Sequence, residues 1–436
     1  MPQPSAPNPI RAFLTLLIVL SACGDDAPPP GTFDTGPRVD TGVPGEDSGP
    51  DDDGGTDDAG AGEDAGTSDA GPQEVPCESE IFELITDPMA RNRPVSVAAT
   101  GRGFVFGWGD TVDVREQART AEVAEGATMA VVRSLTSDDS SARAVSISEG
   151  YAIWLDDGGS GDNIVVRGID TEPTEASLRT FSAATGQHSS PRLFKNGDGW
   201  VATWVRQTGE GEWQIESRAF DGDSESPIVT YGWTLPTSEV AVDFSDERFY
   251  FAWSSEGDVS LAVAGADGSV ITDSTVINSQ GNATSEVSVA FGDDYGIVSF
   301  GVLIEDIRRE IRVRLMDADG AAVRPEQVVS RAPLRGRSPM AASYAGGYAI
   351  AYRASNPAGE DHLRVAFVHG SDGVVVAEYD LGVADFAGGQ SGVAVDDDGG
   401  LAIGWANVEG AESPATVVRG ARLSCGAAWL RCGAMP

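Results

Sequence analysis

The chain has 436 residues, with 68 Asp or Glu against 29 Lys or Arg, and a formal net charge of −39 at pH 7. A surface this acidic repels the phosphates of nucleic acids and anionic lipid headgroups, so we expect neither as a partner. The sequence has only four cysteines and three histidines, without a Cys-x-x-Cys pair. We therefore expect no metal site and no cofactor.

The N-terminus has the pattern of an export signal. Arg11 precedes an apolar run, 12–20, that is too short to remain as a membrane-spanning helix. The run ends in Leu20-Ser21-Ala22-Cys23, which resembles the lipobox of bacterial lipoproteins. The resemblance implies a signal peptide over 1–22, cleavage before Cys23 and lipidation of that cysteine. Gly24 after the cysteine implies, by the same resemblance, sorting to the outer membrane of a bacterial cell envelope. An ordinary signal peptide that ends in Cys is the alternative.

Residues 23–76 form a segment of different composition. Asp, Gly, Ala, Pro, Ser and Thr dominate, Asp-Ala-Gly recurs three times, and 15 acidic residues stand against Arg38 alone. Such a segment cannot bury enough apolar surface to offset its chain entropy, so we predict a disordered acidic tether. Together with the lipobox it resembles the predicted lipoproteins of myxobacteria. Membrane contact is then expected only through the lipid on Cys23.

The rest of the chain is repetitive. Seven times, a turn rich in Gly or Asp precedes a short apolar strand that ends in a bulky residue, and these ends lie 47 to 53 residues apart. The ends are Trp108, Leu155, Trp204, Trp253, Phe300, Tyr352 and Trp405. Each copy has an apolar stretch before it and alternating segments after it, which gives four antiparallel strands per repeat. The period is that of propeller blades.

We predict an all-β, seven-bladed β-propeller of four-stranded antiparallel blades over residues 77–436, because radial closure protects the sheet edges. The last repeat ends after its third strand, and the strand at 81–85 has no partner of its own. This N-terminal strand is expected to complete the last blade. Cys77 beside it can then bond to Cys425 or Cys432, which we favour over a local Cys425–Cys432 loop.

The tryptophans divide into two groups. Trp108, Trp154, Trp204, Trp253 and Trp405 occupy or adjoin equivalent strand ends. Residues placed by a repeat are expected to fill the space between blades rather than to form a carbohydrate platform. A second set falls outside the register and is predicted to be freer for contacts: Trp213, Trp233 and Trp429.

Catalytic motifs are missing from the sequence. It has no His-Glu-x-x-His, no Gly-x-Ser-x-Gly and no phosphate-binding loop, and Lys195 is its only lysine. Carboxylate pairs such as Asp156-Asp157 lie mostly where hairpin turns favour Asp. The turn at Ser371-Asp372-Gly373 resembles the Asp-box of sialidase-like propellers only faintly, since the aromatic residue of that box is missing.

Any site is expected at one end of the channel, where loops entering the innermost strands meet loops between the second and third strands. The candidates from these loops are Arg91, Arg93, Arg143, Asp156, Gln187, His188, Arg206, Glu212, Asn282, Glu305, Asp306, Arg308, Arg335, Arg337, Asp361 and Gln390. Of these, the predicted ligand-binding residues are Arg93, His188, Arg206, Arg337 and Gln390. Such arginines can hold carboxylates or acidic glycans, or they can simply neutralise neighbouring acids.

Two function classes follow. The first is a monomeric, non-catalytic module that binds a protein, peptide or glycan. The alternative is a polysaccharide hydrolase or lyase of propeller fold, with the rim carboxylates as its acids and bases. The absence of a catalytic motif and the presence of a long tether favour the first.

Overall fold

A computed structural model describes residues 73–74, 77–87, 94–112, 115–127, 129–136, 141–157, 162–170, 178–182, 186–222, 224–237, 239–279, 281–292, 294–304, 308–330, 334–383, 391–409 and 415–425. All lie in the compact unit of residues 70–436. The named elements of these ranges are β-strands, and none of the described residues belongs to a helix able to cross a membrane.

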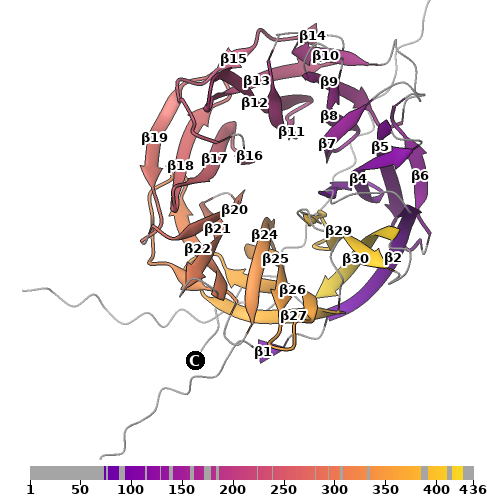
Figure 1. The fold of residues 1–436 in the computed structure, drawn as a ribbon, viewed down its shortest axis with the longest axis vertical. Coiled ribbons are helices and arrows are strands. Elements are labelled where there is room, and N and C mark those ends of the chain that lie inside the picture. The colour runs from indigo at the N-terminus through magenta and orange to yellow at the C-terminus, as the bar shows by residue number, and fades with distance from the viewer. Residues whose placement is uncertain are drawn as a thin grey trace, which may run out of the picture. The chain divides into compact units, whose positions relative to one another are not determined.

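Seven antiparallel sheets surround a central channel (Figure 1), which confirms the predicted seven-bladed propeller. In blades 1 to 6 the first strand lies innermost and the following strands pair outward in chain order, whereas in blade 7 the outermost strand, β2, comes from the N-terminal part of the chain. Innermost strand first, blade 1 consists of β3 Ser96–Thr100, β4 Gly103–Val112, β5 Arg115–Ala124 and β6 Val131–Ser134; blade 2 of β7 Ala142–Ser148, β8 Tyr151–Asp157, β9 Asp162–Gly168 and β10 Arg179–Ser182; and blade 3 of β11 His188–Asn196, β12 Gly199–Gly209 and β13 Glu212–Asp221 with the short β14 Ser224–Glu225 and β15 Val229–Thr230. Blade 4 consists of β16 Ala241–Ser245, β17 Arg248–Ser255, β18 Asp258–Gly265 and β19 Val270–Val276, and blade 5 of β20 Ala283–Phe291, β21 Tyr295–Ile304, β22 Arg308–Asp317 and β23 Gln327–Val328. Blade 6 consists of β24 Arg335–Tyr344, β25 Gly347–Ser355, β26 Asp361–His369 and β27 Val375–Val383, and blade 7 of β28 Gly392–Val395, β29 Leu401–Glu409, β30 Ala415–Cys425 and β2 Cys77–Asp87.

The N-terminal strand closes the ring as predicted. β2 pairs antiparallel with β30 and forms the outermost strand of blade 7. Cys77 and Cys425 are opposite each other in this register and form a disulfide. Of the two cross-links left open by the sequence, the structure therefore selects Cys77–Cys425; Cys432 lies outside the described residues.

The chain just before β2 also pairs with the propeller. β1, Gln73–Glu74, runs parallel to β27 at the outer edge of blade 6. The hydroxyl of Tyr379 on β27 lies 3.0 Å from that of Ser79 on β2. Blades 6 and 7 are therefore linked through the N-terminal segment as well as through their packed faces.

The core lies between neighbouring blades. The five repeat tryptophans are at most 5% exposed, which confirms that they pack the core: Trp108, Trp154, Trp204, Trp253 and Trp405. Trp233 is also buried, stacks on Tyr231 at 6.0 Å and donates its indole N–H to Asp273. The prediction that Trp233 is free for contacts is wrong, because the connection after β15 folds back over β13 and β17.

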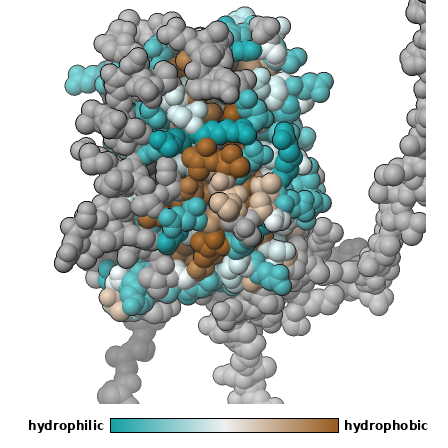
Figure 2. Space-filling view, turned by 90° about the vertical axis from the view of Figure 1, so that its right-hand side faces the viewer, coloured by the Kyte–Doolittle hydropathy of each residue, from teal (hydrophilic) through white to brown (hydrophobic). Residues whose placement is uncertain are grey.

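The outer edges expose some apolar side chains. On the side of the ring that carries β6 and β2, Figure 2 shows an apolar cluster among hydrophilic residues. Val131 and Val132 of β6 are 56% and 36% exposed, and Ile81 of β2 is 50% exposed. β19 has a similar edge in blade 4, with Val276 58% exposed.

Candidate functional site

Strand direction defines two ends of the propeller. Because neighbouring strands of a blade are antiparallel, the starts of the innermost strands and the turns between second and third strands lie at one end, here called the mouth face. The hairpins between first and second strands lie at the other end, here called the base. Cys77 is opposite Cys425, where β30 ends, and therefore lies at the base.

Most arginines of the mouth face are paired with carboxylates. Arg206 Nε lies 2.6 Å from Glu216, Arg308 2.7 Å from Glu310 and Arg309 3.6 Å from Glu286. Two further pairs are Arg143 with Asp162 and Arg353 with Asp361. Of the two roles considered for these arginines, ligand binding and neutralisation of neighbouring acids, the structure favours neutralisation at these positions, because the pairs leave no continuous positive patch.

Two predicted ligand-binding residues, His188 and Arg206, are cross-strand neighbours in blade 3. His188 is only 3% exposed, and burial lowers the pKa of its imidazole, against the raising effects of the Asp162 backbone and of the Glu216 and Asp162 charges. Glu216 accepts hydrogen bonds from Arg206 and from the indole of Trp204 at 2.8 Å. These side chains support one another inside the blade, so His188 does not form part of the exposed mouth surface.

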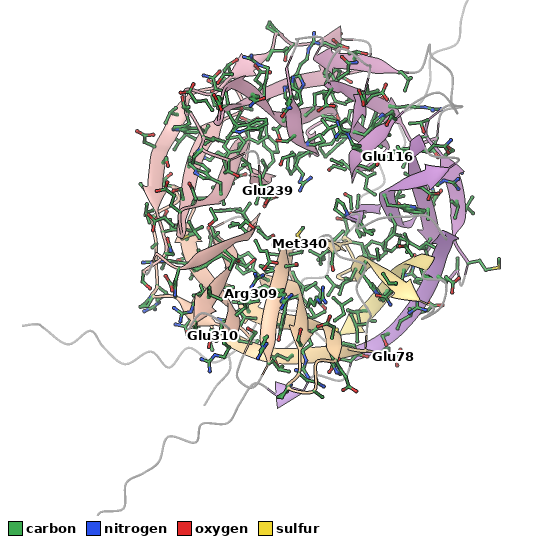
Figure 3. The ribbon with its side chains drawn as sticks, viewed as in Figure 1. Glu78, Glu116, Glu239, Arg309, Glu310 and Met340 are labelled. Carbon is green, nitrogen blue, oxygen red and sulfur yellow. A yellow bond between two sulfur atoms is a disulfide. The ribbon has the colours of Figure 1, made fainter. Side chains whose placement is uncertain are left out.

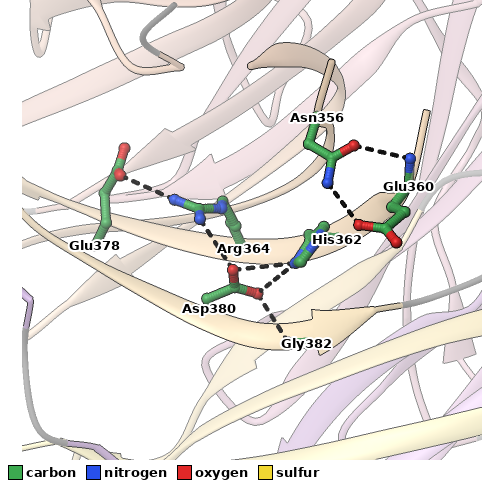
Figure 4. A network of polar contacts seen from close by, with 7 residues as sticks. All are labelled: Asn356, Glu360, His362, Arg364, Glu378, Asp380 and Gly382. Carbon is green, nitrogen blue, oxygen red and sulfur yellow. Dashed lines mark hydrogen bonds and ion pairs between the residues drawn. The ribbon is translucent and has the colours of Figure 1, made fainter. Parts of the chain in front are cut away.

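A similar network lies at the mouth end of blade 6 (Figure 4). Arg364 lies between Glu378, at 3.4 Å, and Asp380, at 2.9 Å. His362 Nδ1 contacts the same Asp380 carboxylate at 3.1 Å, and the backbone N–H of Gly382 donates to it. The network joins β26 to β27 and holds its charges in internal pairs.

Arg335 and Arg337 differ from the other mouth arginines. Both lie within the first three residues of β24, and Arg335 is exposed while Arg337 is half-buried. Among the described residues, no carboxylate lies within ion-pair distance of either side chain. Arg337 acts at longer range, since its charge helps to keep the nearby Asp361 ionised. Arg335 and Arg337 therefore form no ion pair within the described mouth face, although Arg337 interacts at longer range with Asp361.

Two mouth carboxylates are shifted in opposite directions. Burial raises the pKa of Asp156, and the charge of the neighbouring Asp157 acts in the same direction. The backbone N–H of Ser141, which donates to Asp156 at 3.2 Å, acts to lower it but does not outweigh burial. Burial also acts to raise the pKa of Asp361. There, hydrogen bonds from Arg353 and Ser355 and the arginine charges outweigh burial, so the pKa is lowered. Asp361 is therefore held as a carboxylate.

Several candidates from the sequence lie outside the described residues. They are Arg91, Arg93, Glu305, Asp306 and Gln390, which the sequence predicts at the mouth, together with Cys23 and Trp429. In the parts of the chain that the structure covers, no group of three or more His, Cys, Asp or Glu side chains is placed to hold a metal ion.

The innermost strands enclose a channel with a volume of about 570 Å³. Three of them carry a bulge near the mouth, where a non-glycine residue has a positive φ: Ala144 at 51°, Ser190 at 48° and Ser338 at 50°. Each of the three residues lines the channel. Left-handed backbone at non-glycine residues is strained and tends to be kept near functional sites. The bulges mark the mouth as a place where the regular ladder is interrupted.

One layer of the channel is built from equivalent positions of all seven inner strands. In six blades the residue is paired with the one just before the bulky end of the second strand, and in blade 2 with Ile153, just before Trp154. The members are Ser96, Ser146, Arg192, Ala241, Ser288, Met340 and Gly392. Five of the seven are small, so Arg192 and Met340 supply the large side chains of this layer. Figure 3 shows Met340 at the inner end of β24, beside the channel, and Glu239 across from it.

Sequence reasoning did not find Arg192. Its signal is present in the repeat, because an alignment of the seven inner strands on their bulky partners places one arginine in a column of small residues. The first strands were the least regular part of the repeat, since the bulges shift their register by a residue. Their alignment needs the observed pairing.

No protein-family model and no curated protein matches the sequence. Among solved structures, the WD40 domain of coronin from Toxoplasma gondii is similar, with a TM-score of 0.50 and 9% identity over 82% of this chain and 89% of that one. A protein of unknown function from Dyadobacter fermentans has a TM-score of 0.47 and 10% identity over 80% and 99% of the two chains. The NanB sialidase of Streptococcus pneumoniae has 0.44 and 11% over 79% and 70%. At 9% identity the coronin match supports the propeller fold alone.

Proposed function

We propose that this chain is a lipid-anchored recognition module of the bacterial cell envelope, whose propeller binds a protein, peptide or glycan at its mouth face without catalysis. The observation that carries the proposal is the contrast within the mouth. Its other arginines named above are paired with acids, whereas Arg335 and Arg337 have no carboxylate within ion-pair distance among the described residues. Arginines without an ion pair, on an otherwise acidic protein, are available to a ligand.

The path of the chain supports the same face. β1 and β2 both begin toward the base, as their pairing with β27 and β30 requires. The described chain therefore begins, at Gln73, toward the end of the propeller opposite the mouth. In this proposal the tether is attached at that end and the mouth is left to an external partner.

The binding test uses the oxidised protein on a glycan and peptide array. The variant Arg335→Ala/Arg337→Ala is compared with Arg102→Ala, which removes an exposed arginine from the β3–β4 hairpin at the base. We expect saturable binding that the double variant loses and the base variant keeps. Equal binding by both variants, or none by the wild type, contradicts the proposal.

The proposed lipid anchor has its own test. Mass spectrometry of the mature N-terminal peptide should find a diacylated Cys23 in the wild type, and Cys23→Ser should release the protein from the membrane fraction. An unmodified Cys23 in the mature chain, or a chain cleaved elsewhere, contradicts the anchor.

The second candidate, a polysaccharide hydrolase or lyase, is favoured by one observation. Burial raises the pKa of Asp156, which is the direction of shift that a general acid requires. Asp361 has the opposite shift and is bound by Arg353. If Asp156→Asn abolished cleavage of a bacterial or plant polysaccharide that the wild type cleaves, the enzyme would replace the binding module as the proposed function.

A further inference from the structure

Arg192 lies in an unusual place for an arginine. It is on β11, lines the central channel and occupies a layer in which five of the seven equivalent positions hold Ser, Ala or Gly. A guanidinium has five N–H donors. Here the one hydrogen bond from it runs from Nη1 to the carbonyl of the adjacent Pro191, at 3.1 Å. The other N–H groups of the guanidinium have no hydrogen-bond partner among the described residues.

The carboxylates that share the channel do not neutralise Arg192. Within the described residues, no acidic oxygen lies within ion-pair distance of its side chain. Asp243 is directed to blade 5, where it accepts the N–H of Phe291 at 2.6 Å. Glu286 contacts Arg309 at 3.6 Å and Ser338 at 3.3 Å. Glu239 is exposed nearer the mouth, one blade from Arg192, and is the competing carboxylate without an ion pair among the described residues of the channel.

Arg192 is half-buried in the channel wall. Holding a charged group partly out of water without an ionic partner is costly. The same burial lowers the pKa of the Arg192 guanidinium from its usual value. An arginine still stays protonated near neutral pH. A bound anion is the simplest way to compensate such a charge, because it supplies acceptors in the geometry that a guanidinium prefers.

The same layer offers additional donors. Ser96 Oγ accepts the N–H of Ile147 at 3.1 Å, and Ser288 Oγ accepts that of Ala341 at 2.9 Å. Because these oxygens are used as acceptors, their O–H groups remain able to donate, and no acceptor for them is recorded in the described chain. A ring with one guanidinium and several hydroxyls is suited to an oxyanion that also carries hydroxyl groups.

We propose that the channel is a binding site for a small hydroxylated carboxylate of uronic-acid type, with Arg192 as the residue that holds the carboxylate. A volume of about 570 Å³ falls within the range of small-molecule sites. The ligand is either a free sugar acid or the terminal unit of an acidic polysaccharide. The inference rests on the proposed function, since it names the ligand class of the same face.

The test is isothermal titration calorimetry of the full oxidised chain with galacturonate, tetragalacturonate and galactose. Galactose differs from galacturonate at the carboxylate, so it should not bind. Arg192→Gln keeps the three side-chain carbons to Cδ and a polar N–H donor but removes the charge, and we expect the affinity of this variant for galacturonate to fall about 10-fold or more. Arg192→Lys should retain part of it.

Matched controls separate charge from packing. Met340→Ala removes the other large side chain of the layer without changing charge, and should leave galacturonate affinity within about 3-fold of the wild type. Glu239→Gln removes the competing carboxylate and should raise the affinity. Thermal unfolding of each variant checks that it is folded, and the Lys variant serves if Arg192→Gln is not.

The outcomes are distinct. Tighter binding of tetragalacturonate than of the monomer identifies a polysaccharide end as the source, and equal binding a free sugar acid. Wild-type protein that binds neither acid, or an Arg192→Gln variant that binds as well as the wild type, overturns the inference. The proposed recognition function would still stand in that case if array binding depended on Arg335 and Arg337. Conversely, if galacturonate bound in the channel but no array ligand bound, the channel site would stand and the proposed recognition function would lose its support.

Discussion

Cys77 and Cys425 form a disulfide that joins the strand completing the last blade, β2, to its neighbour β30 across 348 residues of chain. The hydroxyl of Tyr344 contacts the Cys425 carbonyl at 3.3 Å, which ties this junction to blade 6 as well. A ring closed by strands from both ends of a chain can open at this seam. The disulfide joins β2 covalently to β30 at this seam, so the ring cannot open there unless the disulfide is reduced.

Loss of the cross-link should therefore lower stability. We expect Cys425→Ser to reduce the free energy of unfolding by about 2–5 kcal/mol, because the disulfide restricts a very long loop in the unfolded chain. Urea unfolding of the oxidised protein measures this. Cys432→Ser is the control and should be neutral; a loss of stability there equal to that of Cys425→Ser would argue for a different pairing.

Two buried tryptophans form a matched pair for the polar interior. The indole N–H of Trp204 donates to the buried Glu216 at 2.8 Å, whereas that of Trp154 has no hydrogen-bond partner in the described residues. Trp204→Phe should cost about 1–3 kcal/mol more than Trp154→Phe, because it leaves a buried carboxylate oxygen without a donor. Chemical denaturation of the two variants compares them directly. Equal losses would show that the hydrogen bond adds nothing beyond packing.

Asp361 should stabilise the fold above the pKa of an unfolded aspartate. Its pKa is lowered by Arg353, Ser355 and the charge of Arg337 against the effect of burial. A lowered pKa gives stability that is present above about 3.8 and is lost as the pH falls through the lower folded value. Asp361→Asn should be less stable than the wild type at pH 7, with the difference shrinking below pH 4. A difference independent of pH would contradict this assignment.

Asp243 should have the opposite dependence. Burial raises the pKa of its carboxyl, despite the lowering effect of the backbone N–H groups of Phe291 and Phe244. The wild type therefore loses stability as the pH rises from the unfolded value toward the raised one. Asp243→Asn, which still accepts the Phe291 N–H, should gain stability relative to the wild type as the pH rises above about 4. The exposed Asp398→Asn is the control, and a parallel trend in both variants would refute the effect.

The sequence repeat was sufficient to predict the fold, because its strongest signal, the apolar second strand, is also the strand with the most regular pairing. For example, β17 pairs with β18, the third strand of its blade, without a shift in register, and β25 pairs with β26 in the same way. The closing strand was predictable for a related reason: β30 lacked a fourth strand, and the apolar run at 81–85 had no other partner.

The candidate site was predictable only in outline. Loop position placed Arg206 and His188 correctly at the mouth end, but burial of His188 and the contact of Arg206 with Glu216 depend on packing within blade 3. Trp233 was misjudged for the same reason, since its burial comes from a chain reversal after β15. Arg192 required the register of the bulged inner strands.

The most direct test of the proposed binding face is hydrogen–deuterium exchange of the full chain with and without the ligand that the array selects. The account predicts slower exchange at the mouth, in residues 141–144, 186–190 and 334–338, with no change at the base hairpins 245–248 and 344–347. Protection centred on the base hairpins or on the outer strands, with the mouth unchanged, would show that the ligand binds elsewhere and would contradict the proposed function.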